Sequence, residues 1–92
     1  DNEGNTALFY ACKNGIYNIV ECLIKKHADI QEENHKKQTP LIISTIYNHD
    51  NIVELLISYG VNVYNKDIYN NTAFHYACKN NNILCMNIIL KR

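Results

Sequence analysis

The sequence predicts an all-α repeat solenoid, made of stacked helix-turn-helix units that are joined by short β-hairpin loops. The main observation is a period of 33 residues, because Thr6, Thr39 and Thr72 are each 33 positions apart. A second observation is a helical spacing of apolar residues late in each unit. One such unit cannot bury its apolar face alone, so consecutive units must stack. The repeats are 1–33, 34–66 and 67–92, of which the last is incomplete.

Whole blocks of sequence recur at this period. The segment YACKN at 10–14 returns at 76–80, and the segment NIVE at 18–21 returns at 51–54. Different blocks recur in different pairs of units. This favours three copies of one unit over a chance match.

The first helix of each unit is predicted to begin at the repeated threonine, whose hydroxyl can cap free backbone N–H groups. Pro40 follows Thr39 at the first helical position, where its missing donor has no effect. The helix is predicted to stop at Gly15 in repeat 1. Asn48 and Asn81 stand at the same place in the other repeats, and asparagine also tolerates the left-handed conformation that ends helices.

The second helix of each unit is predicted from apolar residues at i, i+1, i+4 and i+5, which form one buried helical face. They are Ile19, Val20, Leu23 and Ile24, then Ile52, Val53, Leu56 and Ile57, then Cys85, Met86, Ile89 and Leu90. The linkers at 28–30 and 61–63 are interpreted as extended hairpin segments. They lead toward turns at Lys37 and Asn70, which correspond to Gly4 in repeat 1.

Composition limits the function. The chain has 92 residues, no net charge and 47% hydrophobic residues, as expected for one small globular domain. A pI of about 7.1 argues against a nucleic-acid partner. No apolar run is long enough to span a membrane, and no signal peptide is evident. Because the chain begins at Asp1 rather than Met, we expect a fragment of a longer protein.

The four cysteines are predicted to be buried thiols of the core. They are Cys12, Cys22, Cys78 and Cys85, and they form no Cys-x-x-Cys pair. Cys12 and Cys78 occupy the same position two units apart, which places them beyond disulfide reach. Free buried cysteine behaves as a small hydrophobic residue. We therefore expect a reducing, intracellular compartment, the cytoplasm, and no metal or other cofactor.

No enzyme motif is present. The sequence contains no phosphate-binding glycine loop and no Gly-x-Ser-x-Gly motif. His75 and Cys78 lie three residues apart on one predicted helix, which raises the possibility of a nucleophile pair. The preferred interpretation is that His75 bonds its own helical turn and that Cys78 belongs to the core.

These units resemble ankyrin repeats. The Thr-Pro-Leu-His-x-Ala pattern of that family is matched at 6–11, 39–44 and 72–77, and its Ile-Val-x-x-Leu-Leu pattern at 19–24 and 52–57. The motif histidine is kept only as His75, and the proline only as Pro40. Lys37 stands where the family usually has glycine, so a strained or differently bent turn is expected there.

The resemblance implies a protein-binding surface on the concave face, formed by the hairpin tips and the first helices. The family's contact positions correspond in repeat 1 to Asn2, Glu3, Asn5, Lys13, Asn14 and Glu33. In repeat 2 they are His35, Lys36, Gln38, Ile46, Tyr47 and Lys66. In repeat 3 they are Ile68, Tyr69, Asn71, Lys79 and Asn80.

Four of these positions carry large apolar residues in adjacent repeats: Ile46, Tyr47, Ile68 and Tyr69. Such clusters mark interaction sites, and tyrosine is favoured at binding hot spots. Surrounding lysines indicate a partner with some acidic residues. The alternative is that Tyr and Ile are simply abundant, with 7 and 13 copies.

Three functions follow from this interpretation. The first is a protein–protein interaction module with no catalysis of its own. The second is a structural spacer or self-associating segment of a longer solenoid, which would use Leu84 and Ile88 at the C-terminal end, with adjoining repeats as possible neighbours. The third is a regulatory segment attached to a catalytic domain outside this chain.

Overall fold

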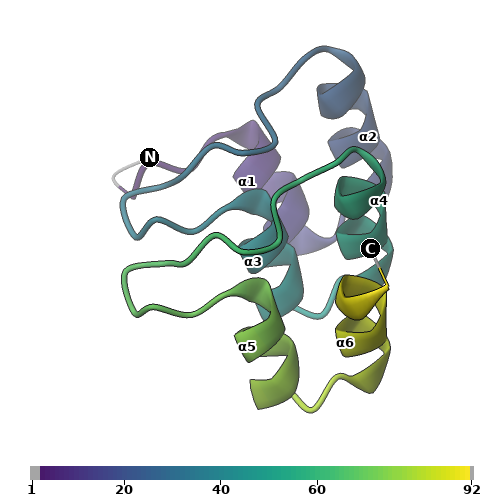
Figure 1. Ribbon diagram of the computed structural model, residues 1–92. Coiled ribbons are helices and arrows are strands. Elements are labelled where there is room, and N and C mark those ends of the chain that lie inside the picture. The colour runs from purple at the N-terminus through teal and green to yellow at the C-terminus, as the bar shows by residue number, and fades with distance from the viewer. Residues whose placement is uncertain (1–2, 92) are drawn as a thin grey trace.

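The computed structural model describes residues 3–91, and these form six helices in two rows (Figure 1). The inner row contains α1 (Ala7–Asn14), α3 (Pro40–Ile46) and α5 (Ala73–Lys79). The outer row contains α2 (Tyr17–Lys25), α4 (Asp50–Ser58) and α6 (Ile83–Leu90). Each repeat contributes one helix to each row, and consecutive repeats pack side by side. The predicted all-α repeat fold is confirmed. None of these helices has the length and apolar character needed to cross a bilayer.

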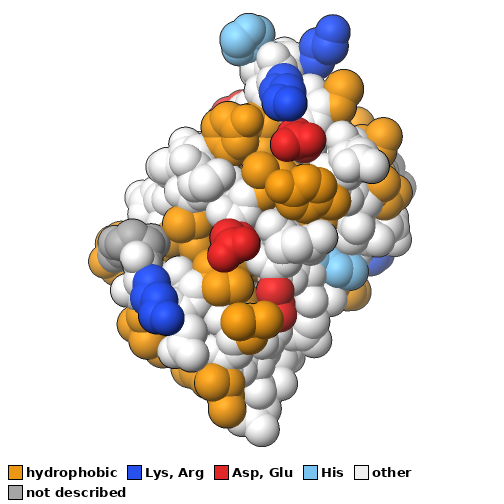
Figure 2. Space-filling view, turned by 90° about the vertical axis from the view of Figure 1, so that its right-hand side faces the viewer, with side chains coloured by type: hydrophobic (Ala, Val, Ile, Leu, Met, Phe, Trp, Pro, Cys, Tyr) orange, Lys and Arg blue, Asp and Glu red, His pale blue; other side chains and the backbone are white. Residues whose placement is uncertain are grey.

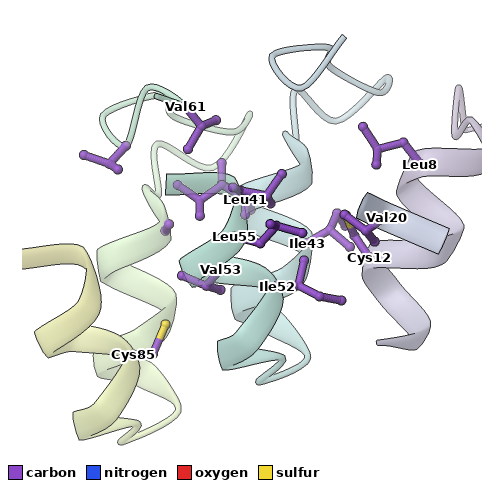
Figure 3. Packing of buried hydrophobic residues seen from close by; sticks show 14 of the residues in the cluster. Leu8, Cys12, Val20, Leu41, Ile43, Ile52, Val53, Leu55, Val61 and Cys85 are labelled. Carbon is purple, nitrogen blue, oxygen red and sulfur yellow. The ribbon is translucent and has the colours of Figure 1, made fainter. Parts of the chain in front are cut away.

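The core lies between the two rows and runs through all three repeats (Figure 3). Val20, Ile52, Val53 and Leu56, from the predicted faces of the second helices, have no exposed surface. They pack with inner-row residues such as Leu41 in one continuous cluster. The core therefore belongs to the stack, not to any single repeat.

Two of the three predicted threonine caps are present. The Thr39 hydroxyl accepts a hydrogen bond from the Ile42 backbone N–H at 3.2 Å. Thr72 forms a reciprocal capping box, in which its own N–H donates to His75 Nδ1 at 2.8 Å. The expectation for Thr6 is wrong, because its hydroxyl donates to the Glu32 carboxylate and makes no cap. The Thr6 side chain is thus oriented toward Glu32, and its oxygen accepts from none of the free N–H groups of the first turn.

Left-handed residues recur at the repeat period, which confirms the predicted helix stops. Gly15, Asn48 and Asn81 have φ values of 73°, 63° and 57°. Lys37 is also left-handed, with φ 58°. Gly4 and Asn70, which occupy the same turn position in repeats 1 and 3, are left-handed as well. A lysine Cβ is strained in this conformation, unlike glycine.

Lys37→Gly is expected to raise the free energy of unfolding by about 1 kcal/mol, since glycine carries no Cβ penalty at positive φ. Asn70→Gly is the matched control at the next turn, with φ 69°. It should give a smaller gain, because asparagine already tolerates this region. Urea unfolding followed by circular dichroism measures both. A destabilised Lys37→Gly protein would show that the lysine side chain supports the turn.

The hairpin tips contain no strand among residues 3–91, so the loops differ from the expected extended hairpins. The reason lies in two buried polar side chains, Asn34 and Asp67, at the same repeat position. Asn34 Oδ1 accepts from the N–H groups of Lys36 and Gln38, each at 3.0 Å. Asp67 Oδ1 does the same for the next tip. Because side chains satisfy these donors, the tips close as tight turns rather than as β-ladders.

The core interpretation holds for only two of the four cysteines. Cys12 and Cys85 are buried, whereas Cys22 and Cys78 are exposed. Burial raises the pKa of both Cys12 and Cys85 to about 11, and this outweighs hydrogen bonds to Ser44 and Thr45 that lower it.

Candidate protein-binding surface

A hollow of about 150 Å³ lies on the concave face, which we define as the surface of the hairpin tips and inner helices. It sits between repeats 1 and 2. Its lining is Glu3, Asn5, Phe9, Tyr10, Lys13, Lys36, Gln38, Ile43, Ile46 and Tyr47. Seven predicted contact residues are thereby brought together: Glu3, Asn5, Lys13, Lys36, Gln38, Ile46 and Tyr47. The hollow joins apolar walls to a few charged groups, the usual make-up of a recognition site.

Lys13 and Tyr47 meet across the boundary of two repeats. Lys13 lies in the last turn of α1, and Tyr47 directly follows α3. The Lys13 Nζ lies 5.6 Å from the centroid of the Tyr47 ring, within range of a cation–π interaction. The Tyr47 side chain is nevertheless 45% exposed. It therefore remains available to a partner while its cationic neighbour holds it in place.

Lys36 lies on the hairpin tip of repeat 2 and faces a carboxylate from repeat 1. Its Nζ is 3.9 Å from Glu3 Oε1, and both side chains are exposed. An exposed ion pair of this length contributes little to stability. A partner carboxylate can therefore replace Glu3 at small cost.

Ile68 and Tyr69 lie on the tip of repeat 3, outside the hollow, with 52% and 62% of their surface exposed. The Ile68 backbone N–H donates to the Lys36 carbonyl at 3.0 Å. This bond attaches one tip to the next, so the two side chains extend the concave face beyond Lys36. The sequence alone placed Ile68 and Tyr69 on a hairpin tip. The backbone bond between the two tips shows that they lie beside Lys36.

Several other predicted contact residues have bonds within the chain. Asn80 Nδ2 donates to the carbonyls of Thr45 and Ile46, which ties repeat 3 to the end of α3. Asn14 Nδ2 donates to the Tyr10 carbonyl. The Asn71 N–H donates to Asp67, and the His35 ring packs on Gly4. The Lys79 Nζ lies 5.9 Å from the centroid of the Tyr76 ring. Lys66 is exposed. Asn2 lies outside the described residues.

Besides the buried Phe9, sequence reasoning missed Tyr10 and Ile43, which line the hollow from α1 and α3. They share one repeat position with Tyr76, whose hydroxyl donates to the buried Asp67 carboxylate. Burial, and then this bond, raise the pKa of Tyr76. The available signal was the register itself, because a large residue stands at this position in all three repeats.

The His75 side chain has a structural role, as predicted, because it completes the capping box with Thr72. The Cys78 Sγ lies 3.4 Å from the Met86 Sδ, in a sulfur–sulfur contact. Within residues 3–91, no three His, Cys, Asp or Glu side chains gather closely enough to hold a metal ion.

The outer-helix face, formed by α2, α4 and α6, is a second exposed surface. Hydrophobic and acidic side chains are interspersed over it, and two shallow hollows there share Glu54 and Leu84 (Figure 2). Basic residues also stand at the ends of these helices, namely Lys25 and Lys26 at the end of α2 and Lys91 after α6, so this face carries both signs of charge.

Helix pairs repeated every 33 residues and stacked through one core define a repeat solenoid. The family model for ankyrin repeats, in three copies, matches residues 17–92. The chain belongs to the ankyrin-repeat family.

Three relatives illustrate the range of proteins that contain similar repeats. A Fowlpox virus (strain NVSL) protein, named as an ankyrin repeat protein, is 36% identical over 94% of this chain. A similarly named protein of Acanthamoeba polyphaga mimivirus is 38% identical over 82% of it. The E3 ubiquitin-protein ligase XBAT33 of Arabidopsis thaliana is 31% identical over 94%. The chain spans 26%, 10% and 17% of the lengths of these relatives.

Proposed function

We propose that this chain binds a protein partner on its concave face, with Tyr47, Ile68 and Tyr69 as anchors, and that it performs no catalysis itself. Ankyrin repeats are generally protein–protein interaction modules. The observation that carries the finer proposal is the group of large, exposed apolar side chains at the end of α3 and on the tip of repeat 3. Aromatic anchors of this kind dominate binding energy at interfaces.

The partner segment is expected to carry acidic residues. Lys13, Lys36, Lys66 and Lys79 are exposed on the concave face, and Glu3 already pairs with one of them. Charge complementarity of this kind mainly sets the association rate and the choice of partner. Raising the salt concentration should therefore weaken the complex, chiefly through slower association.

A regulatory role beside a catalytic domain is the second candidate. The Arabidopsis relative is named as an E3 ubiquitin-protein ligase, and this chain matches 17% of its length. In such an arrangement the repeats would select the partner and the remainder of the protein would act on it. We also propose a cytoplasmic location, which four unpaired thiols support.

The test is an affinity capture from source-cell lysate with three baits, read by mass spectrometry. The first is the native chain, and the second carries Tyr47→Ser, Ile68→Ser and Tyr69→Ser. We expect a protein that the native bait captures and the triple variant loses, with affinity reduced by about 2 kcal/mol or more.

The third bait carries Tyr59→Ser and Leu84→Ser, which remove comparably exposed residues at the end of α4 and in α6, away from the concave face. It should capture the same protein as the native chain. Circular dichroism verifies that all baits keep their helices. Equal capture by the native chain and the triple variant would refute the concave-face proposal.

A further inference from the structure

The hollow between repeats 1 and 2 has an apolar floor. Phe9 and Ile43 line it and are only 2% and 7% exposed, so they lie at its base. Ile46, at the end of α3, is partly buried beside them. Tyr10 and Tyr47 are each 45% exposed and line the hollow nearer to solvent. A group that reaches the floor therefore leaves water for a mainly apolar surface.

The volume of the hollow limits what can enter it. It measures about 150 Å³, whereas pockets for drug-sized ligands usually measure about 300 to 1,000 Å³. Apolar cavities of about 150 Å³ hold a single benzene-sized group. The hollow therefore has room for one large apolar side chain, and not for a whole helix or a drug-sized molecule.

Two lysines from neighbouring repeats also line this hollow. The Lys36 Nζ lies 3.9 Å from Glu3 Oε1, and the Lys13 Nζ lies 5.6 Å from the centroid of the Tyr47 ring. Among the described residues of the lining, Glu3 is the acidic group that opposes these two cations. The lining thus carries a net positive charge, which favours a carboxylate close to the side chain that enters.

The equivalent position in repeat 3 shows what would close the hollow. Tyr76 stands 33 positions after Ile43. Its hydroxyl donates to the buried Asp67 carboxylate, so its side chain extends from α5 to the base of its own hairpin tip. Repeat 2 has the shorter Ile43 at this position, and the hollow lies between α3 and the tip residues Lys36 and Gln38. The short side chain at position 43 leaves this space open.

The apolar wall of the hollow is also specific to repeat 2. Lys79 stands in repeat 3 where repeat 2 has Ile46, and Asn80 stands where it has Tyr47. The Asn80 Nδ2 donates to the Ile46 carbonyl at 3.0 Å, so this amide bonds the preceding repeat. The combination of an apolar floor, an apolar wall and nearby lysines therefore belongs to the boundary of repeats 1 and 2.

We propose that the hollow binds one large apolar side chain from a short extended segment of the partner, which carries a carboxylate two residues away. This inference rests on the proposed function and names the chemistry that the concave face selects. The apolar side chain packs on Phe9 and Ile43, and the carboxylate meets Lys13 or Lys36. Side chains two residues apart in an extended segment point to the same side, so both can face the hollow together.

Ile43→Tyr is expected to close the hollow and to leave the stack folded. Repeats 1 and 3 already carry tyrosine at this position, as Tyr10 and Tyr76, so the repeat accepts that side chain. Ile43→Val is the matched control, because it removes one methyl group and leaves the hollow open. Circular dichroism and urea unfolding verify that both variants keep the fold.

A phage-displayed library of random dodecapeptides, selected on the native chain, tests the proposal. Enriched peptides are synthesised and titrated by fluorescence anisotropy. We expect them to share one large apolar residue with an Asp or Glu two residues away. Replacing that apolar residue with Ala should weaken binding about tenfold or more. Ile43→Tyr should weaken it by a similar factor, and Ile43→Val by less than about threefold.

The outcomes separate this proposal from the proposed function, with Ile68→Ser, Tyr69→Ser as a double variant outside the hollow. Peptides that bind Ile43→Tyr as tightly as the native chain, but bind the double variant weakly, would overturn the hollow and leave the concave-face function unaffected. Peptides that bind both variants like the native chain would contradict both proposals. Enriched peptides that tolerate Ala at every apolar residue, or a selection that enriches none, would also overturn the proposal for the hollow.

Discussion

Leu56→Ala is expected to lower the free energy of unfolding by roughly 2 to 5 kcal/mol, the usual loss for a large buried side chain. Leu56 has no exposed surface, and it lies in α4, which packs on both α2 and α6. A cavity at this site weakens contacts of the middle repeat with both neighbours. The total stability of a domain of this size is roughly 5 to 14 kcal/mol, so the loss is a large share of it.

Equilibrium urea unfolding of the native chain, Leu56→Ala and Leu90→Ala measures this effect. Leu90→Ala is the control on α6, because its side chain is largely exposed and its removal should change the stability by about 0.5 kcal/mol or less. A similar loss in both variants would contradict a core that is shared through the centre of the stack.

Raising the pH from 9 toward 11 is expected to destabilise the chain through its two buried thiols. The pKa of Cys12 and of Cys85 is about 11 in the folded chain, against an ordinary value of 9.0. Between these pH values the unfolded chain loses protons that the folded chain keeps, so stability is complete below pH 9 and falls as pH rises. Each thiol contributes a slope of roughly 1 kcal/mol per pH unit in this window.

Urea unfolding at a series of pH values checks this, with the Cys12→Ala, Cys85→Ala double variant as the control. That variant keeps every tyrosine and lysine, including Tyr76, so the difference between the two profiles isolates the thiols. Between pH 9 and pH 10, its free energy of unfolding should fall by roughly 2 kcal/mol less than that of the native chain. Parallel profiles would show that the two thiols titrate alike in the folded and unfolded chains.

Local features repeated in all three units were predictable from the sequence. The left-handed Gly15, Asn48 and Asn81 follow from backbone sterics, which act within a few residues. The buried faces of the second helices follow from helical periodicity in the same way. The 33-residue register then placed these elements side by side.

Features that depend on a neighbour in space were not predictable. The Thr6 hydroxyl bonds Glu32, 26 residues away, instead of capping its helix. Cys78 is exposed, although Cys12 at the same position is buried, because exposure depends on which repeat lies against it.

The candidate site likewise contains residues that the sequence predicted and residues that it did not. Family positions indicated Lys13, Lys36 and Tyr47, which do meet at one hollow. They did not indicate Tyr10 or Ile43, because the walls of the hollow arise only when two repeats are packed together. The sequence placed Ile68 and Tyr69 on a hairpin tip. Only the hydrogen bond from the Ile68 N–H to the Lys36 carbonyl shows that this tip lies beside the tip of repeat 2.

The most direct test of the concave-face account is hydrogen–deuterium exchange of the native chain, alone and with the protein that it captures. Backbone amides at 34–38, 43–47 and 67–71 should exchange more slowly in the complex, while those of α2, α4 and α6 should be unchanged. This measurement needs no substitution, so it does not depend on how a variant folds. Slowing confined to the outer helices would place the partner on the opposite side of the stack and contradict the account.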